Sequence, residues 1–115
     1  MVGQIVVGLV ALLHVGFFVL ESVLWTKPTG MRIFGLSAED AETTRVLASN
    51  QGVYNAMLAL GLGWAAVSGN REALLFLLVY VFVVGIYGGL TAKPTILALQ
   101  AAPALVAFGL VWLRW

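Results

Sequence analysis

The chain has 115 residues and a net charge of +1; 62% of its residues are hydrophobic and 10% are charged. Soluble domains carry roughly a quarter charged residues, so lipid is the expected solvent for much of this surface. The small net charge excludes the basic footprint of a nucleic-acid-binding protein. With no cysteine and one histidine, the chain excludes disulfides, iron–sulfur clusters, thiol catalysis and a conventional multi-histidine metal site, and we expect no cofactor.

The first apolar segment predicts a membrane helix over about residues 2–25. A helix needs about 20 apolar residues to cross a bilayer core. We interpret the segment as a retained helix rather than a signal peptide, because no lysine or arginine precedes it and His14 interrupts it. The Lys-Pro-Thr-Gly motif at 27–30 predicts a turn that ends this helix and opens a polar loop over 26–37.

Three more apolar segments follow, over about 45–67, 73–90 and 95–113, and we expect helices over about 38–68, 72–92 and 94–113. Ser37 is the expected N-cap of the first of these, because acidic residues follow it in the turn where the helix dipole favours negative charge. The sequence therefore predicts an all-α protein. We expect a polytopic integral membrane protein whose residues 1–115 form a single domain, a four-transmembrane-helix bundle.

The basic residues predict an orientation in the membrane. Four of them lie on the side of the first and third connections, and two lie on the other side: Lys27, Arg32, Arg45 and Lys93 against Arg71 and Arg114. Lysine and arginine concentrate in cytoplasmic loops. We therefore predict that the long loop 26–44 is cytoplasmic and that both termini lie outside.

Glu21 and His14 are the most informative residues in the first segment. They are seven positions apart, which is about two helical turns, so both lie on one helix face. An ionisable residue inside a membrane helix is costly and usually faces protein or water. We treat both as candidate catalytic residues for proton transfer, with Trp25 at the membrane interface nearby.

The other helices carry further polar side chains at similar depths. Counting about 1.5 Å per residue from the membrane surface places Glu21 in a shallow layer with residues of all three other helices, and His14 in a deeper layer with Asn55. This predicts a polar pocket with these candidate ligand-binding residues: Asn50, Gln51, Tyr54, Asn55, Tyr87, Gln100 and Trp25. The alternative is that the amides tie helices together by hydrogen bonds.

Gly85 and Gly89 form a small-xxx-small pair in the third helix. Such pairs allow two helices to approach closely. Packing within one bundle is the favoured interpretation, and a homo-oligomer assembled through Gly85 and Gly89 is the alternative.

The chain also resembles a known family. The stretch 14–21 followed by Trp-Thr-Lys-Pro at 25–28, the Asn-Gln-Gly-Val-Tyr-Asn motif at 50–55, the Gly-Ile-Tyr-Gly motif at 85–88, and Gln100 with Pro103 resemble the bacterial domain of unknown function (DUF) 1304 family. The resemblance implies four transmembrane helices and a bacterial inner (plasma) membrane. It implies no activity.

Three functions are compatible with these features. The first is binding of a small amphipathic or isoprenoid-like ligand beside Glu21 and His14, with conversion of that ligand left open because no nucleophile–base pair or cofactor motif is visible. The second is proton-coupled transport of a small molecule, which with four helices requires an oligomer. The third is a structural or assembly role among membrane lipids, in which the polar residues only join helices.

Overall fold

The computed structural model describes residues 1–115, and every regular element in it is a helix. The predicted all-α class is therefore confirmed. The chain divides into two compact units, of which unit 1 comprises Met1–Leu13 and Ala59–Trp115, and unit 2 comprises His14–Leu58. The single four-helix domain over 1–115 stays a prediction.

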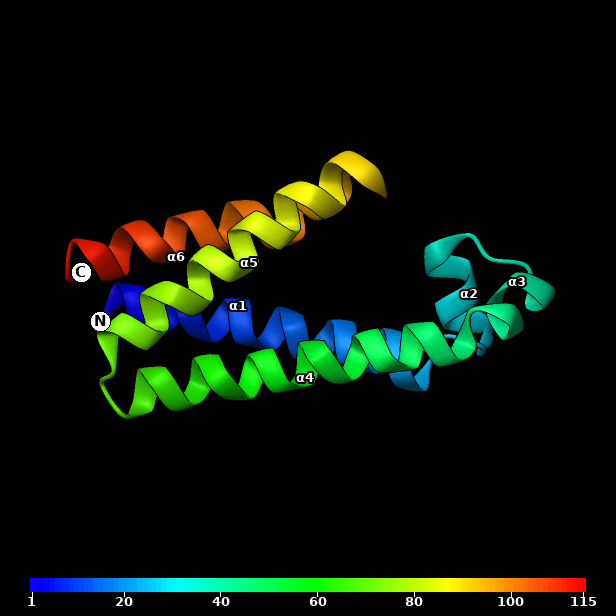
Figure 1. Cartoon of the computed structure of the whole chain (residues 1–115), viewed down its shortest axis with the longest axis horizontal. Helices are drawn as coiled ribbons and strands as arrows, with labels where there is room; N and C mark the ends of the chain where they lie inside the picture. The colour runs from blue at the N-terminus through cyan, green and yellow to red at the C-terminus, as the bar shows by residue number, and fades with distance from the viewer. The chain divides into compact units, whose positions relative to one another are not determined.

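Unit 1 contains α5 (Arg71–Thr91), the π-helical turn η2 (Leu97–Ala101) and α6 (Ala102–Trp112), together with the start of α1 (Val2–Phe18) and the end of α4 (Arg45–Val67). Figure 1 shows α5 and α6 side by side. A methyl group at Gly85 would approach the main-chain nitrogen of Ala101 to 2.8 Å, so α5 and η2 are in close backbone contact. The close approach predicted for this glycine is confirmed, and its use in a homo-oligomer stays a prediction.

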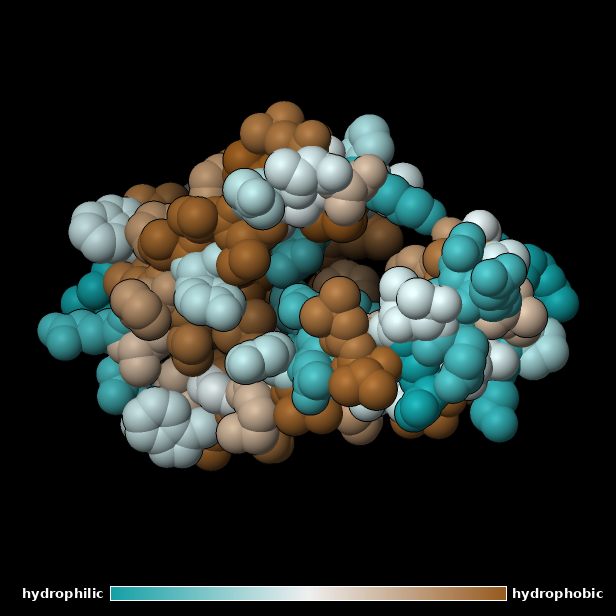
Figure 2. Space-filling view, turned by 45° about the vertical axis from the view of Figure 1, so that its right-hand side comes forward, coloured by the Kyte–Doolittle hydropathy of each residue, from teal (hydrophilic) through white to brown (hydrophobic).

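The core of unit 1 consists of aliphatic and small side chains, which are almost completely buried: Leu62, Ala65, Leu74, Leu78, Val81, Ala104 and Ala107. Large apolar side chains also cover its exterior, among them Phe76, Val83 and Leu105. Figure 2 shows this apolar surface in brown, with hydrophilic residues gathered instead over α2 (Pro28–Phe34) and α3 (Ala38–Thr43) of unit 2. Exposed apolar area on this scale marks a surface that contacts lipid or protein.

Two helical stretches are long and apolar enough to cross a membrane, Val2–Val23 and Arg71–Thr91. A third apolar stretch, Leu97–Trp112, is shorter. The length of α4 is sufficient, at 23 residues, but it carries Asn50, Gln51 and Asn55. The apolar helices agree with the membrane character expected from composition, while the number of membrane crossings stays a prediction.

Unit 2 contains the π-helical turn η1 (Val19–Val23), α2 (Pro28–Phe34), α3 (Ala38–Thr43) and the first part of α4. The expectation of a polar loop over 26–37 was wrong for most of its length, because α2 occupies it. Pro28 is the first residue of α2, where a missing N–H costs no hydrogen bond. Gly35 ends the helix at φ 64°, a left-handed conformation that favours glycine.

The helix expected over 38–68 is divided at Thr44 into α3 and α4. Its predicted N-cap is confirmed, because the main-chain N–H of Asp40 donates to Ser37 Oγ at 3.0 Å. The division has a side-chain cause. The Thr44 hydroxyl donates to the carbonyl oxygen of Asp40 at 2.7 Å, a local bond of the kind that bends helices.

Candidate functional site

Glu21 and Asn55 are joined directly in unit 2. The Asn55 amide donates from Nδ2 to Glu21 Oε1 at 2.6 Å, across 34 residues of sequence. Asn55 is 8% exposed, so its amide is held almost entirely inside the protein. A buried amide needs such a partner, and a bond to a carboxylate is stronger than one between neutral groups. The Glu21 carboxylate is thus fixed in orientation by Asn55.

Glu21 lies in the π-helical turn η1, which follows α1 without a break. The turn ends with the N–H of Leu24 donating to the carbonyl oxygen of Val19 at 2.9 Å, a bond that spans five residues instead of four. Single π-helical turns are rare and occur often at functional sites, because the extra residue re-aims the side chains that follow. Here the turn helps to direct Glu21 toward α4.

A second contact sets the register of α1 and η1 against α4. Ser22 donates from Oγ to the carbonyl oxygen of Ser49 at 2.8 Å. Gly52 is buried beside it, and any side chain at this position would collide with Ser22. The residue numbers of the paired groups rise on one helix as they fall on the other, so the two helices run antiparallel here.

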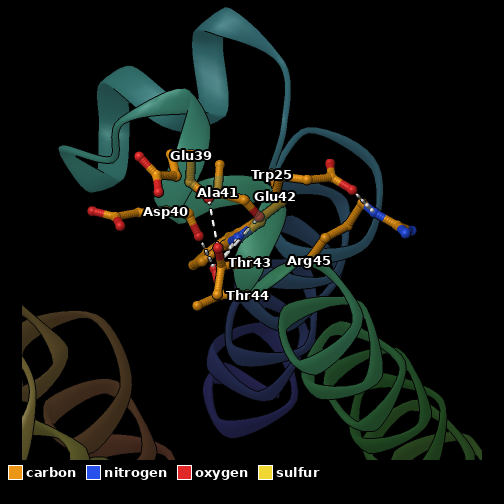
Figure 3. A network of polar contacts seen from close by, with 8 residues as sticks. All are labelled: Trp25, Glu39, Asp40, Ala41, Glu42, Thr43, Thr44 and Arg45. Atoms are coloured by element: carbon orange, nitrogen blue, oxygen red, sulfur yellow. Dashed lines mark hydrogen bonds and ion pairs between the residues drawn. The ribbon is translucent and has the colours of Figure 1, made fainter.

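A third contact joins Trp25 to Thr44, in the part of unit 2 that contains α2 and α3. The Trp25 indole donates from Nε1 to Thr44 Oγ1 at 2.9 Å, and its ring lies 4.8 Å from that of Phe34 between ring centres. Figure 3 shows Thr44 between Trp25 and Asp40, accepting from the first and donating to the second. Trp25 therefore joins the turn after η1 to the junction of α3 and α4.

His14 is completely buried. It lies seven residues, about two helical turns, before Glu21. Its ring meets the Phe17 ring edge-on, with centroids 5.1 Å apart and an angle of 71° between the planes. No hydrogen bond links His14 to Glu21 directly, as their spacing of about 10 Å along the helix predicts. A joint role in proton transfer stays a prediction.

The expected grouping of residues by depth was wrong for Asn55. It was assigned to the deeper layer with His14, yet it bonds Glu21 of the shallow layer. Counting Cα positions ignored that every side chain on a helix tilts toward the N-terminus of that helix. On antiparallel helices the two side chains therefore tilt toward each other and bridge several ångströms of axial offset.

Within unit 2, no hydrogen bond joins Glu21 to the other predicted ligand-binding residues of α4. Asn50, Gln51 and Tyr54 are exposed on α4, and Tyr54 is 70% exposed. In unit 1, Tyr87 is 69% exposed and Gln100 lies in η2, partly exposed. Their role in binding stays a prediction.

Sequence reasoning did not select Ser22, Ser49, Gly52 or Thr44. A small residue at 52 within a helix rich in amides was a signal of close helix approach, since Gly is otherwise unfavourable in a helix interior. The hydroxyl groups carried no such signal, because serine and threonine are common in helices for local reasons. No group of three or more His, Cys, Asp or Glu side chains gathers to hold a metal ion.

Comparison with known proteins agrees with the sequence resemblance. The family model described as "Protein of unknown function (DUF1304)" matches residues 8–112. The chain is 35% identical over 103 residues to the uncharacterized protein YpaA of Lactococcus lactis subsp. lactis (strain IL1403), covering 86% of this chain and 87% of that protein. No solved structure matches the chain.

Proposed function

The chain belongs to the DUF1304 family, and we propose that it is an integral membrane protein that binds a small amphipathic ligand at Glu21. The two apolar stretches, Val2–Val23 and Arg71–Thr91, support the membrane placement. In this proposal α4 and α6 complete a set of four crossings of the bacterial plasma membrane. The polar α2 and α3 then lie on the cytoplasmic side, and both termini lie outside.

The hydrogen bond between Asn55 and Glu21 carries the proposal for a site. Oε1 of the carboxylate accepts the hydrogen bond from Asn55, whereas Oε2 accepts no hydrogen bond in the structure. Glu21 is also not fully buried, in contrast to His14. An oriented, partly accessible carboxylate in apolar surroundings suits a ligand whose head group donates a hydrogen bond, a hydroxyl or an ammonium group.

The rest of the ligand would be apolar. The residues about one helical turn before Glu21 are Phe17 and Phe18, and both are apolar. An isoprenoid-like or other aliphatic tail would lie against such groups, because burying apolar area yields roughly 25 cal/mol per Å². If the ligand is converted, Glu21 and His14 are the groups that can transfer protons.

The same contacts also favour a structural role as a second candidate. Ser22 and Asn55 both form hydrogen bonds from one helix to another, as residues that stabilise membrane bundles do. In that case the Glu21 carboxylate is only the acceptor that satisfies Asn55.

Native mass spectrometry of the protein released from lipid nanodiscs distinguishes the two roles. Glu21→Gln keeps the shape and an acceptor oxygen for Asn55 but removes the charge. We expect wild type to retain a small molecule that Glu21→Gln loses, while Glu39→Gln, which removes an exposed carboxylate on α3, retains it. Equal retention by both variants, or no bound molecule in wild type, would favour the structural role.

A further inference from the structure

A cavity of about 230 Å³ lies within unit 1, where the ends of its helices meet. Its walls come from the start of α1, the turn between α4 and α5, and the end of α6, and they include Gly3, Ala66, Gly69, Leu74 and Val111. Sites that enclose a whole small molecule measure roughly 300–1,000 Å³. This cavity is smaller, and its size suits a charged group with a few attached atoms.

The charged side chains that line the cavity are both arginines, Arg71 and Arg114, and the Met1 amino group also lies there, donating to the main-chain oxygen of Trp115. No acidic side chain lines it, and the nearest in sequence, Glu72, is exposed. Guanidinium groups present several N–H donors in a planar fork that matches phosphate and carboxylate oxygens. The lining is therefore complementary to an anion.

Arg71 is held in place by α6. It donates from Nη2 to the carbonyl oxygen of Trp112 at 2.9 Å and from Nε to that of Val111 at 3.4 Å, and its guanidinium carbon lies 5.4 Å from the Trp112 ring centre. These contacts use two of its five N–H donors. Arg71 thus serves as a cap for the end of α6 and keeps donors available at the cavity.

Arg114 occupies a conformation that is rare for its residue type. Its φ is 61°, the left-handed region in which a non-glycine residue costs roughly 1–2 kcal/mol. Its side chain is exposed and makes no hydrogen bond. Glycine would adopt this conformation with less strain. We therefore attribute the arginine at the cavity rim to a role of its side chain in binding.

Three tryptophans mark the level of this cavity on unit 1. Trp64 lies in the last turn of α4, Trp112 ends α6, and Trp115 lies three residues beyond it; they are 59%, 58% and 65% exposed. Exposed tryptophan is enriched where a membrane protein passes through the headgroup region. Arg71 begins α5 directly after the turn that follows α4, and Arg114 lies just beyond α6, so an anion bound between them would lie at headgroup level.

We propose that this cavity binds the phosphate of an anionic membrane phospholipid between Arg71 and Arg114. The proposal rests on the membrane placement proposed above, and it is independent of the Glu21 site. It is supported by the two guanidinium groups and by the tryptophans that place the cavity at headgroup level. A zwitterionic lipid would bind more weakly, because its own cationic group is repelled by the arginines.

The test is a titration of the detergent-solubilised protein with phosphatidylglycerol and, separately, phosphatidylcholine, read by native mass spectrometry. Arg114→Gln is the decisive variant, since that side chain supports no other contact, and it should weaken phosphatidylglycerol binding roughly fivefold. Arg71→Lys should also weaken it, because lysine keeps the charge and loses the fork. Arg45→Gln removes an exposed arginine of unit 2 and should leave binding unchanged.

Three results would overturn the proposal: binding of phosphatidylglycerol that Arg114→Gln leaves unchanged, equal binding of phosphatidylcholine, or displacement of the lipid by inorganic phosphate. Circular dichroism of each variant establishes that it is folded. Glu21→Gln should bind phosphatidylglycerol as wild type does. A failure of the Glu21 site is therefore distinguishable from a failure of the lipid site.

Discussion

Gly52 lies directly against Ser22, so closely that a methyl group at position 52 would collide with Ser22 Oγ and approach its Cβ to 3.1 Å. The same Ser22 hydroxyl donates to the carbonyl oxygen of Ser49 at 2.8 Å. The absent side chain and the hydrogen bond therefore belong together: Gly52 allows the helices to come close enough for Ser22 to reach the main chain of α4.

Gly52→Ala should lower the free energy of unfolding by about 1–3 kcal/mol, because the new methyl group displaces the Ser22 hydroxyl and forces the helices apart. Gly63→Ala on the same helix meets no atom within 4 Å and should be neutral or stabilise by up to about 1 kcal/mol. Unfolding in mixed micelles with increasing SDS measures both. Equal stability of the two variants would contradict the close contact.

The bond between Asn55 and Glu21 predicts unequal effects for its two partners. Asn55→Ala leaves the Glu21 carboxylate without its donor and should destabilise the protein by about 1–2 kcal/mol. Glu21→Gln still offers an oxygen to Asn55 and should cost less than about 1 kcal/mol. A double-mutant cycle of Asn55→Ala with Glu21→Ala, which removes the acceptor that glutamine keeps, gives the coupling energy in the same SDS titration. A coupling near zero would mean that the two side chains do not interact in the membrane.

Thr44 accepts from Trp25 and donates to the Asp40 carbonyl, so it joins three parts of unit 2 (Figure 3). Thr44→Val preserves the shape and removes both hydrogen bonds, and we expect a loss of about 1–2 kcal/mol. Thr43→Val is the control, because Thr43 is exposed and donates only to the Glu39 carbonyl. Limited proteolysis within α2 and α3 should be faster for Thr44→Val alone. Equal rates for both variants would assign Thr44 no special role.

The sequence was sufficient for features that depend on near neighbours. Ser37 was identified as an N-cap from the acidic residues that follow it, and the approach at Gly85 from its spacing to Gly89. Glu21 was selected because an ionisable group is costly in an apolar helix. These inferences need only the helix and its surroundings.

Features that depend on contacts between helices could not be read in the same way. The pairing of Glu21 with Asn55 depends on the register that Ser22 and Gly52 set, and on side-chain tilt, which axial counting ignores. The helix α2 was taken for a loop because Pro28 both stops one helix and starts another. The turn η1 has no residue signature, since its extra residue is accommodated by packing.

The four proposed crossings predict a labelling pattern that differs from that of two crossings. The chain has no native cysteine, so single cysteines at the exposed Thr29, Ser68 and Thr95 report their side of the membrane with an impermeant maleimide. If α4 crosses, positions 29 and 95 react from the cytoplasmic side and position 68 from the outside. If only the two stretches that contain α1 and α5 cross, positions 29 and 68 react from one side and position 95 from the other. A cysteine at the fully buried Leu78 should react only after denaturation.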